Sequence, residues 1–143
     1  MATSRQWVWG LTAVLMVVLA GCGGPAVLPR GSVRGNVTWE GTPIKEGTIT
    51  FVPIQGTQGA PTAAIIRDGQ YLLEADSGPI VGMNRVEIIA NRETGETIPA
   101  VPPATVEIRK VEQFIPAKFN RSSTLEQDVV AGENEFDFDL TAK

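Results

Sequence analysis

The sequence predicts an all-β fold, an antiparallel sandwich of seven short strands behind an apolar segment at the amino terminus. Apolar and polar residues alternate with a period of two through much of the chain, which is typical of strands with one buried face. Glycine, proline, asparagine and aspartate separate these stretches, and the 143 residues include 15 Gly and 10 Pro. No segment has the i, i+3, i+4, i+7 apolar spacing of an amphipathic helix. The length suits a single domain.

The composition excludes several classes of protein. The chain has no histidine, so a Ser–His–Asp triad, a Cys–His dyad and a His-ligated zinc ion are impossible. Its single cysteine cannot form an intramolecular disulfide or a CxxC redox pair. A net charge of −4 offers no basic surface to nucleic acid. We therefore expect a protein that is not an enzyme, holds no metal or other cofactor and binds no nucleic acid.

Residues 1–21 have the pattern of a secretory signal peptide. Arg5 is the only charged residue before an apolar stretch of 14 residues from Trp7 to Ala20. A helix needs about 20 residues to cross a bilayer, so this stretch is too short to span one. A charged start, a short apolar centre and small residues at the end predict a segment that is cleaved off.

The end of this segment, Leu19-Ala20-Gly21-Cys22, resembles the lipobox of bacterial lipoproteins. The resemblance implies that Leu19, Ala20 and Gly21 are recognised by the signal peptidase, and that the Cys22 thiol receives a diacylglyceryl group. The new amino terminus would then be acylated too, for example with palmitate. Each buried CH₂ contributes about 0.8 kcal/mol, so several acyl chains hold a protein on a membrane. A free cysteine beside an ordinary cleavage site is the alternative.

Residues 22–31 are interpreted as the lipidated cysteine and a flexible tether. The nine residues after Cys22 include glycine and proline and reach about 30 Å when fully extended. Gly23 stands where lipoproteins retained in the inner membrane carry aspartate, so the resemblance implies the outer membrane. The predicted location is the bacterial cell envelope, on the periplasmic or the surface face of that membrane.

The mature domain, residues 32–143, begins with a clear succession of strands. Residues 33–39 alternate apolar and polar, and a turn follows at Gly41-Thr42-Pro43. Asp68-Gly69 is a strong hairpin signal between two further strands. Four segments of this half are enriched in β-branched and aromatic residues, which predicts strands at 48–52, 62–66, 70–75 and 85–90.

The second half of the domain is less regular. Residues 91–104 contain Pro99, Pro102 and Pro103 and are predicted to form a long loop. Residues 105–113 are compatible with a short strand or with a helical turn. Strands are predicted again at 125–130 and 135–140, separated by a turn at residues 132–134.

Several of these segments resemble carboxypeptidase regulatory-like domains. The resemblance is carried by the V-x-G-x-V pattern in residues 33–37, the Gly41-Thr42-Pro43 turn, the strand 47–53 and Asp68-Gly69-Gln70-Tyr71. It extends to residues 115–120 and 132–138, which are similar to small bacterial lipoproteins built from this domain. It implies a transthyretin-like (prealbumin/Ig-like) β-sandwich. Enzymes of that fold depend on histidines or paired tyrosines, and this chain has no histidine and one tyrosine.

Two clusters of polar residues are candidates for chemistry. Acidic residues alternate along the last predicted strand, but side chains on one face of a strand lie about 6.5–7 Å apart, too far to surround Ca²⁺ alone. We expect a solvated face that guards a sheet edge. The acidic residues are Glu133, Glu135, Asp137 and Asp139.

The second cluster consists of the hydroxyl residues 122–124 together with Asp128 and Lys118. It offers hydroxyls but no suitable base to activate them, so these residues are interpreted as turn residues.

A sugar-binding surface would need an exposed aromatic side chain. Trp39 is the only tryptophan after the leader, and it shares a strand face with Val33 and Val37, so we expect it in the core. Phe114 and Phe119, on either side of Pro116, are predicted to hold an irregular crossing against the sandwich.

The sequence thus favours a lipid-anchored envelope protein with a non-catalytic interaction or structural module. Its expected partners are the membrane and either envelope proteins or polysaccharide, with residues 91–104 as the first candidate for the contact. The alternative is a carbohydrate-binding module for envelope or extracellular polysaccharide.

The anchor is tested by replacing Cys22 with serine, which removes the thiol that would carry the lipid. The unchanged chain should incorporate labelled fatty acid and sediment with membranes, whereas Cys22→Ser should do neither. Sedimentation of Cys22→Ser with membranes in high salt would contradict the anchor.

Overall fold

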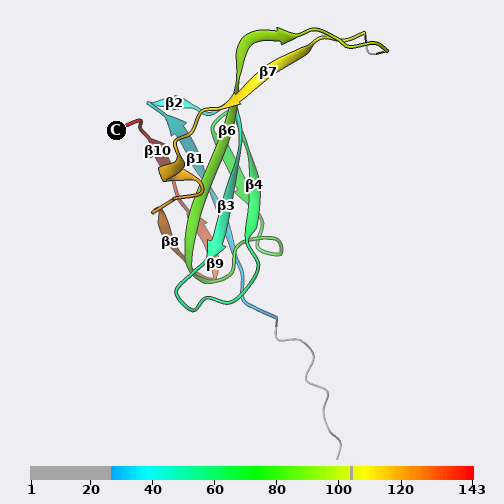
Figure 1. Ribbon diagram of the computed structural model, residues 1–143. Coiled ribbons are helices and arrows are strands. Elements are labelled where there is room, and N and C mark those ends of the chain that lie inside the picture. Colours follow the sequence, from blue (N-terminus) through cyan, green and yellow to red (C-terminus); the bar gives the residue numbers. More distant parts are fainter. Residues whose placement is uncertain (1–26, 104) are drawn as a thin grey trace, which may run out of the picture.

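The structure is a computed structural model that describes residues 27–103 and 105–143. The predicted signal peptide, its recognition residues and Cys22 lie outside the described residues. The all-β prediction is confirmed, because the described residues form ten strands and one 3₁₀ turn (Figure 1). In chain order these are β1 (Gly31–Trp39), β2 (Thr42–Pro43), β3 (Glu46–Pro53), β4 (Thr62–Arg67), β5 (Gln70–Leu73), β6 (Gly82–Ile98), β7 (Ile108–Gln113), η1 (Ala117–Phe119), β8 (Glu126–Val129), β9 (Gly132–Glu135) and β10 (Phe138–Leu140).

The strands form one sheet that curls around an apolar interior. Its order is β10-β1-β5-β4-β3-β6-β7, with β2 and β9 on β1 and β8 on β6. β4 and β5 share a single pair, Arg67 with Gln70, at the predicted Asp68-Gly69 turn. The two strands diverge beyond this pair, and the sheet bends there. Asp68 and Gly69 both have positive φ, as this turn requires.

The structure differs from the prediction in the number and the direction of strands. There are ten strands in the described residues, because β2, β7 and β9 are additional to the seven predicted. β9 covers the predicted turn at residues 132–134, and an interruption at residues 136–137 shortens the last predicted strand to β10. β9 and β10 run parallel to β1, with Gly31 opposite Gly132 and Val37 opposite Phe138, whereas all other strand pairs are antiparallel. Alternation along a strand reveals its buried face but carries no information about the direction of its neighbour.

The predicted loop at residues 91–104 is wrong over its first half. β6 is 17 residues long and continues to Ile98. From Asn91 to Ile98 it pairs with β7. This pairing also decides the open question at residues 105–113, since 108–113 is a strand. Both faces of this two-stranded extension are in water, so its sequence lacks the apolar alternation that predicts a strand. Residues 91–103 and 105–113, called the arm below, project from the body (Figure 1).

The core contains the residues that alternate inward along the body strands. Val33, Ile49, Phe51 and Ile66 are fully buried. The buried apolar residues that join them are Val37, Ile44, Ala64, Tyr71, Leu73, Val86, Ile88, Ala90, Ile115, Val129, Phe138 and Leu140.

Gly35 allows the carboxyl-terminal segment to pass close to β1. It lies opposite Tyr71 in the β1–β5 pair. A Cβ atom at this position would be 1.9 Å from the carbonyl oxygen of Phe136, at the interruption between β9 and β10. The Tyr71 hydroxyl donates a 2.8 Å hydrogen bond to the same oxygen. The central glycine of the V-x-G-x-V pattern is therefore required for β1 to be flanked on both sides.

β1 joins the two ends of the body. Its first residue, Gly31, donates to the Pro79 carbonyl, and Pro29 accepts a hydrogen bond from Val81. The predicted tether is therefore bound to the body from Pro29 onward. The last residue of β1, Trp39, lies at the other end, beside the base of the arm. The eight residue steps from Gly31 to Trp39, at about 3.3 Å each, separate these ends by about 26 Å.

Candidate binding site

The arm is held together by ion pairs along its own length. Arg92 and Glu112 approach to 2.7 Å, Arg109 and Glu93 to 3.0 Å, and Lys110 and Glu96 to 2.7 Å. All six side chains are about half exposed or more, so each pair contributes less than about 1 kcal/mol. Six of the seven charged side chains of the arm are therefore paired within it, and the seventh, Glu107, is exposed.

The tip of the arm is apolar. Residues 98–106 carry no charged side chain, and the first charged residue after them is the exposed Glu107. Ile98, Val101, Val106 and Ile108 are all exposed, as is Val111 in the stem. Exposed aliphatic residues gathered on one projection are typical of an interaction surface.

A hollow of about 700 Å³ lies at the base of the arm. Trp39 and Phe114 form one wall, with ring centroids 5.9 Å apart and planes at 80°. The Arg92 guanidinium lies 5.3 Å from the centre of the Phe114 ring, a cation–π contact. The remaining lining residues come from the β1–β2–β3 connection and the start of the arm, and they are Glu40, Thr42, Pro43, Ile44, Lys45, Glu46, Asn91 and Glu93.

This hollow combines aromatic faces with hydrogen-bonding groups on its rim. Trp39 is partly buried, packs against the core and also lines the hollow, so the expectation of a core residue describes only one of its faces. Glu40, Lys45 and Asn91 supply acceptors and donors within the same lining. Such a site suits a ligand with apolar faces and hydroxyl or amide edges. The sequence interpretation missed this hollow, since its two aromatic residues, Trp39 and Phe114, are 75 positions apart in the chain.

Phe114 and Phe119, which were predicted together, have different surroundings. Phe114 lines the hollow, whereas Phe119 packs against the core and lies under the Lys118 ammonium, 4.8 Å from its ring centre.

The acidic residues near the carboxyl terminus are bound to the neighbouring strand. Arg34 pairs with Glu135 at 3.3 Å, and Thr38 donates to Asp139 at 2.5 Å. Asp137 accepts hydrogen bonds of 2.7 and 3.0 Å from the backbone and side-chain nitrogens of Asn36, and Glu133 lies opposite Ser32. Within residues 27–103 and 105–143, no three metal-ligating side chains are grouped to hold an ion.

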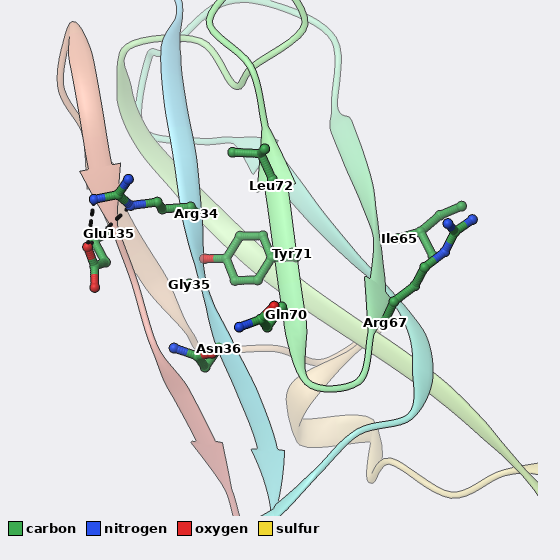
Figure 2. Close-up of a pocket in the computed structure, with 9 residues that line it drawn as sticks. All are labelled: Arg34, Gly35, Asn36, Ile65, Arg67, Gln70, Tyr71, Leu72 and Glu135. Atoms are coloured by element: carbon green, nitrogen blue, oxygen red, sulfur yellow. Dashed lines mark hydrogen bonds and ion pairs between the residues drawn. The ribbon is translucent and has the colours of Figure 1, made fainter.

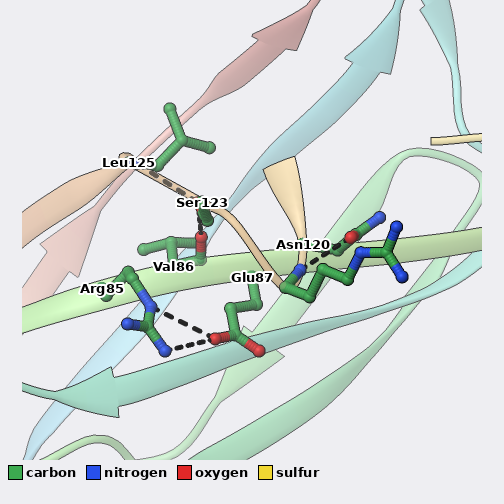
Figure 3. Close-up of polar contacts among 7 residues, drawn as sticks. Arg85, Val86, Glu87, Asn120, Ser123 and Leu125 are labelled. Atoms are coloured by element: carbon green, nitrogen blue, oxygen red, sulfur yellow. Dashed lines mark hydrogen bonds and ion pairs between the residues drawn. The ribbon is translucent and has the colours of Figure 1, made fainter. Parts of the chain in front are cut away.

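Residues 122–124 form a turn tied to the sheet. Ser123 is buried; its hydroxyl donates to the Val86 carbonyl and accepts from the Leu125 amide (Figure 3). The Asn120 side chain accepts from the Arg121 amide at 2.6 Å. These contacts are those of a turn. Lys118 donates to the Lys143 carbonyl, whereas the Ser123 hydroxyl donates to Val86.

A second, shallower hollow of about 670 Å³ lies on the outer face where β4 and β5 diverge. Figure 2 shows the Arg34–Glu135 pair on one side and Ile65 with Arg67 on the other. Tyr71 lies between them with its hydroxyl bound to Phe136. Burial, and next the nearby Asp137 carboxylate, raise the pKa of Tyr71 well above its ordinary value. Tyr71 is therefore a neutral structural donor at physiological pH.

The chain matches no protein-family model, no curated protein and no solved structure. In the part of the chain that the structure describes, no helix is long and apolar enough to cross a membrane. The predicted lipidation site, Cys22, and its recognition residues Leu19, Ala20 and Gly21 precede that part.

Proposed function

We propose that this chain is a lipid-anchored protein of the bacterial cell envelope, whose β-domain is a non-catalytic interaction or structural module. The resemblance of Leu19-Ala20-Gly21-Cys22 to a lipobox supports the anchor. The observation that carries the module is the projecting arm, in which six charged side chains pair internally and exposed aliphatic side chains gather toward the tip. The proposed location is the outer membrane.

The proposed fold of this module is a transthyretin-like sandwich of the carboxypeptidase regulatory-like kind. An all-β, curled sheet that buries alternate residues is compatible with it. The role of Gly35 supports the resemblance, because the V-x-G-x-V pattern coincides with a position where a Cβ atom has no room. The parallel β9 and β10 and the arm are features that the resemblance did not imply.

The arm is the proposed contact surface for an envelope protein. Ordering exposed valine and isoleucine side chains against a partner removes apolar area from water, at about 25 cal/mol per Å². Six charges of the arm pair with one another, so only Glu107 is left to attract a charged partner. We therefore propose an uncharged, apolar groove as the surface it enters.

Photo-crosslinking in intact cells tests this contact. A benzophenone amino acid at Ile108 on the arm should capture one partner protein as an adduct of defined mass. Ile65 on the body is the matched control, because the two isoleucines are 64% and 58% exposed. An adduct that is equally abundant at Ile65, or stronger there, would contradict a contact made by the arm.

The second candidate function is binding of envelope or extracellular polysaccharide. A specific observation favours it: Trp39 and Phe114 form an aromatic wall in a hollow with a polar rim. Sugars present C–H faces that stack on aromatic rings and hydroxyls that bond to such a rim.

A glycan array on the purified chain tests the second candidate. If the hollow binds sugar, Trp39→Ala should weaken binding by about tenfold or more, a loss of about 1.4 kcal/mol. Trp39→Phe keeps an aromatic face and should retain part of the affinity. Circular dichroism shows whether each variant is folded. Absence of any glycan binding, or full binding by Trp39→Ala, would exclude this role for the hollow.

A further inference from the structure

We infer that the end of the domain where the chain enters β1 is a membrane-contact surface, and that it rests on the lipid bilayer with the arm directed away from it. The surface comprises residues 27–31, 54–60 and 130–132. This inference rests on the proposed lipid anchor at Cys22 and adds which face of the domain the bilayer meets.

The first argument is the short length of chain between the anchor and the body. Pro29 is already bound to the body through the Val81 amide at 2.9 Å, and Arg30 forms a bridge with Ile80. Only seven residue steps separate Cys22 from Pro29, which span at most about 25 Å when fully extended. An acylated Cys22 therefore holds this end of the body close to the lipid headgroups.

The second argument is that the segments around this entry point belong to one end of the body. The Val130 carbonyl lies beside Gly31, 2.4 Å from where its Cβ would be. A Cβ atom at Gly59 would lie 2.6 Å from the Ile80 side chain and 3.5 Å from the Leu28 side chain. A shallow hollow between them is lined by Leu28, Pro29, Gln55, Gly56, Thr57, Gln58, Ile80 and Val81.

The third argument is the composition of this end. Residues 53–61 and 129–132 contain no charged side chain. Val27 is 95% exposed and Val130 is 54% exposed, and both lie where the anchor would bring lipid. The 54–60 and 130–132 segments therefore bring no ionised side chain to the headgroup boundary, where desolvating one would cost free energy.

Charged residues border these segments and would lie at the rim of the surface. Arg30 is partly buried and donates to the Gly78 carbonyl, and Glu126 accepts a hydrogen bond from Gln55. Other exposed carboxylates at this end are Glu74, Asp76 and Glu133.

The far end of the domain has the opposite character. The arm begins about 26 Å away along β1, and its stem carries the three ion pairs. Figure 1 shows the arm leaving the body at the end opposite the entry of the chain into β1. With the entry end on the bilayer, the tip of the arm is presented to partners beyond the membrane surface.

Site-specific fluorescence quenching in vesicles tests this orientation. Val130→Cys and Val111→Cys are matched variants, since the two valines are 54% and 56% exposed at opposite ends of the molecule. Each is made in the full chain in a lipoprotein-processing bacterium and labelled with an environment-sensitive dye. The labelled protein is placed in phosphatidylethanolamine/phosphatidylglycerol vesicles that carry a headgroup quencher. Val27→Cys provides a second probe at the entry end, and circular dichroism checks the fold of each variant.

We expect the dye at Val130 and at Val27 to be quenched at least threefold more than the dye at Val111. Equal quenching at Val130 and Val111 in chains that float with the vesicles would overturn the orientation and leave the anchor intact. Chains that carry no acyl mass and do not float would instead overturn the proposed anchor. The two failures are therefore distinguishable.

Discussion

The carbonyl oxygen of Phe136 occupies the space where Gly35 would carry a side chain, and the rest of the fold depends on this close approach. Because the carboxyl-terminal segment passes over Gly35, it reaches β1 first as β9 and then as β10, both parallel to it. β1 is thereby paired on both sides, with β5 and β2 opposite the terminal strands. Tyr71 holds the crossing with a hydrogen bond to the same carbonyl.

In this arrangement, one face of β9 and β10 packs on the core and the other face binds β1. Phe138 and Leu140 enter the core, while the carboxylates on the other face bind residues of β1. The acidic row is thus part of the mechanism that keeps the terminal strands in register with β1. It also places charge on an edge of the sheet, which opposes pairing with other chains.

The sequence predicted the strands whose two faces differ in polarity, and it failed where that difference disappears. β1, β3, β4 and β5 have one face in the core and one in water, so their alternation was visible. The end of β6 and the whole of β7 have both faces in water, so residues 91–98 were mistaken for a loop. Trp39 has one face on the core and one in the hollow, a division that a pattern of alternate residues cannot express. The parallel direction of β9 and β10 follows from the Gly35 crossing, which involves residues 101 positions apart.

The most direct test of this account is the pH dependence of stability in Tyr71→Phe. Because the pKa of Tyr71 is raised in the folded state, the unchanged chain should lose stability as the pH rises above the ordinary tyrosine value of 10.0. Removal of the hydroxyl should lower the free energy of unfolding at pH 7 by about 1 kcal/mol and reduce this alkaline loss. Tyr71 is the only tyrosine, so the difference between the two titration curves belongs to this residue. Equal stability at pH 7 together with identical curves above pH 10 would contradict the account.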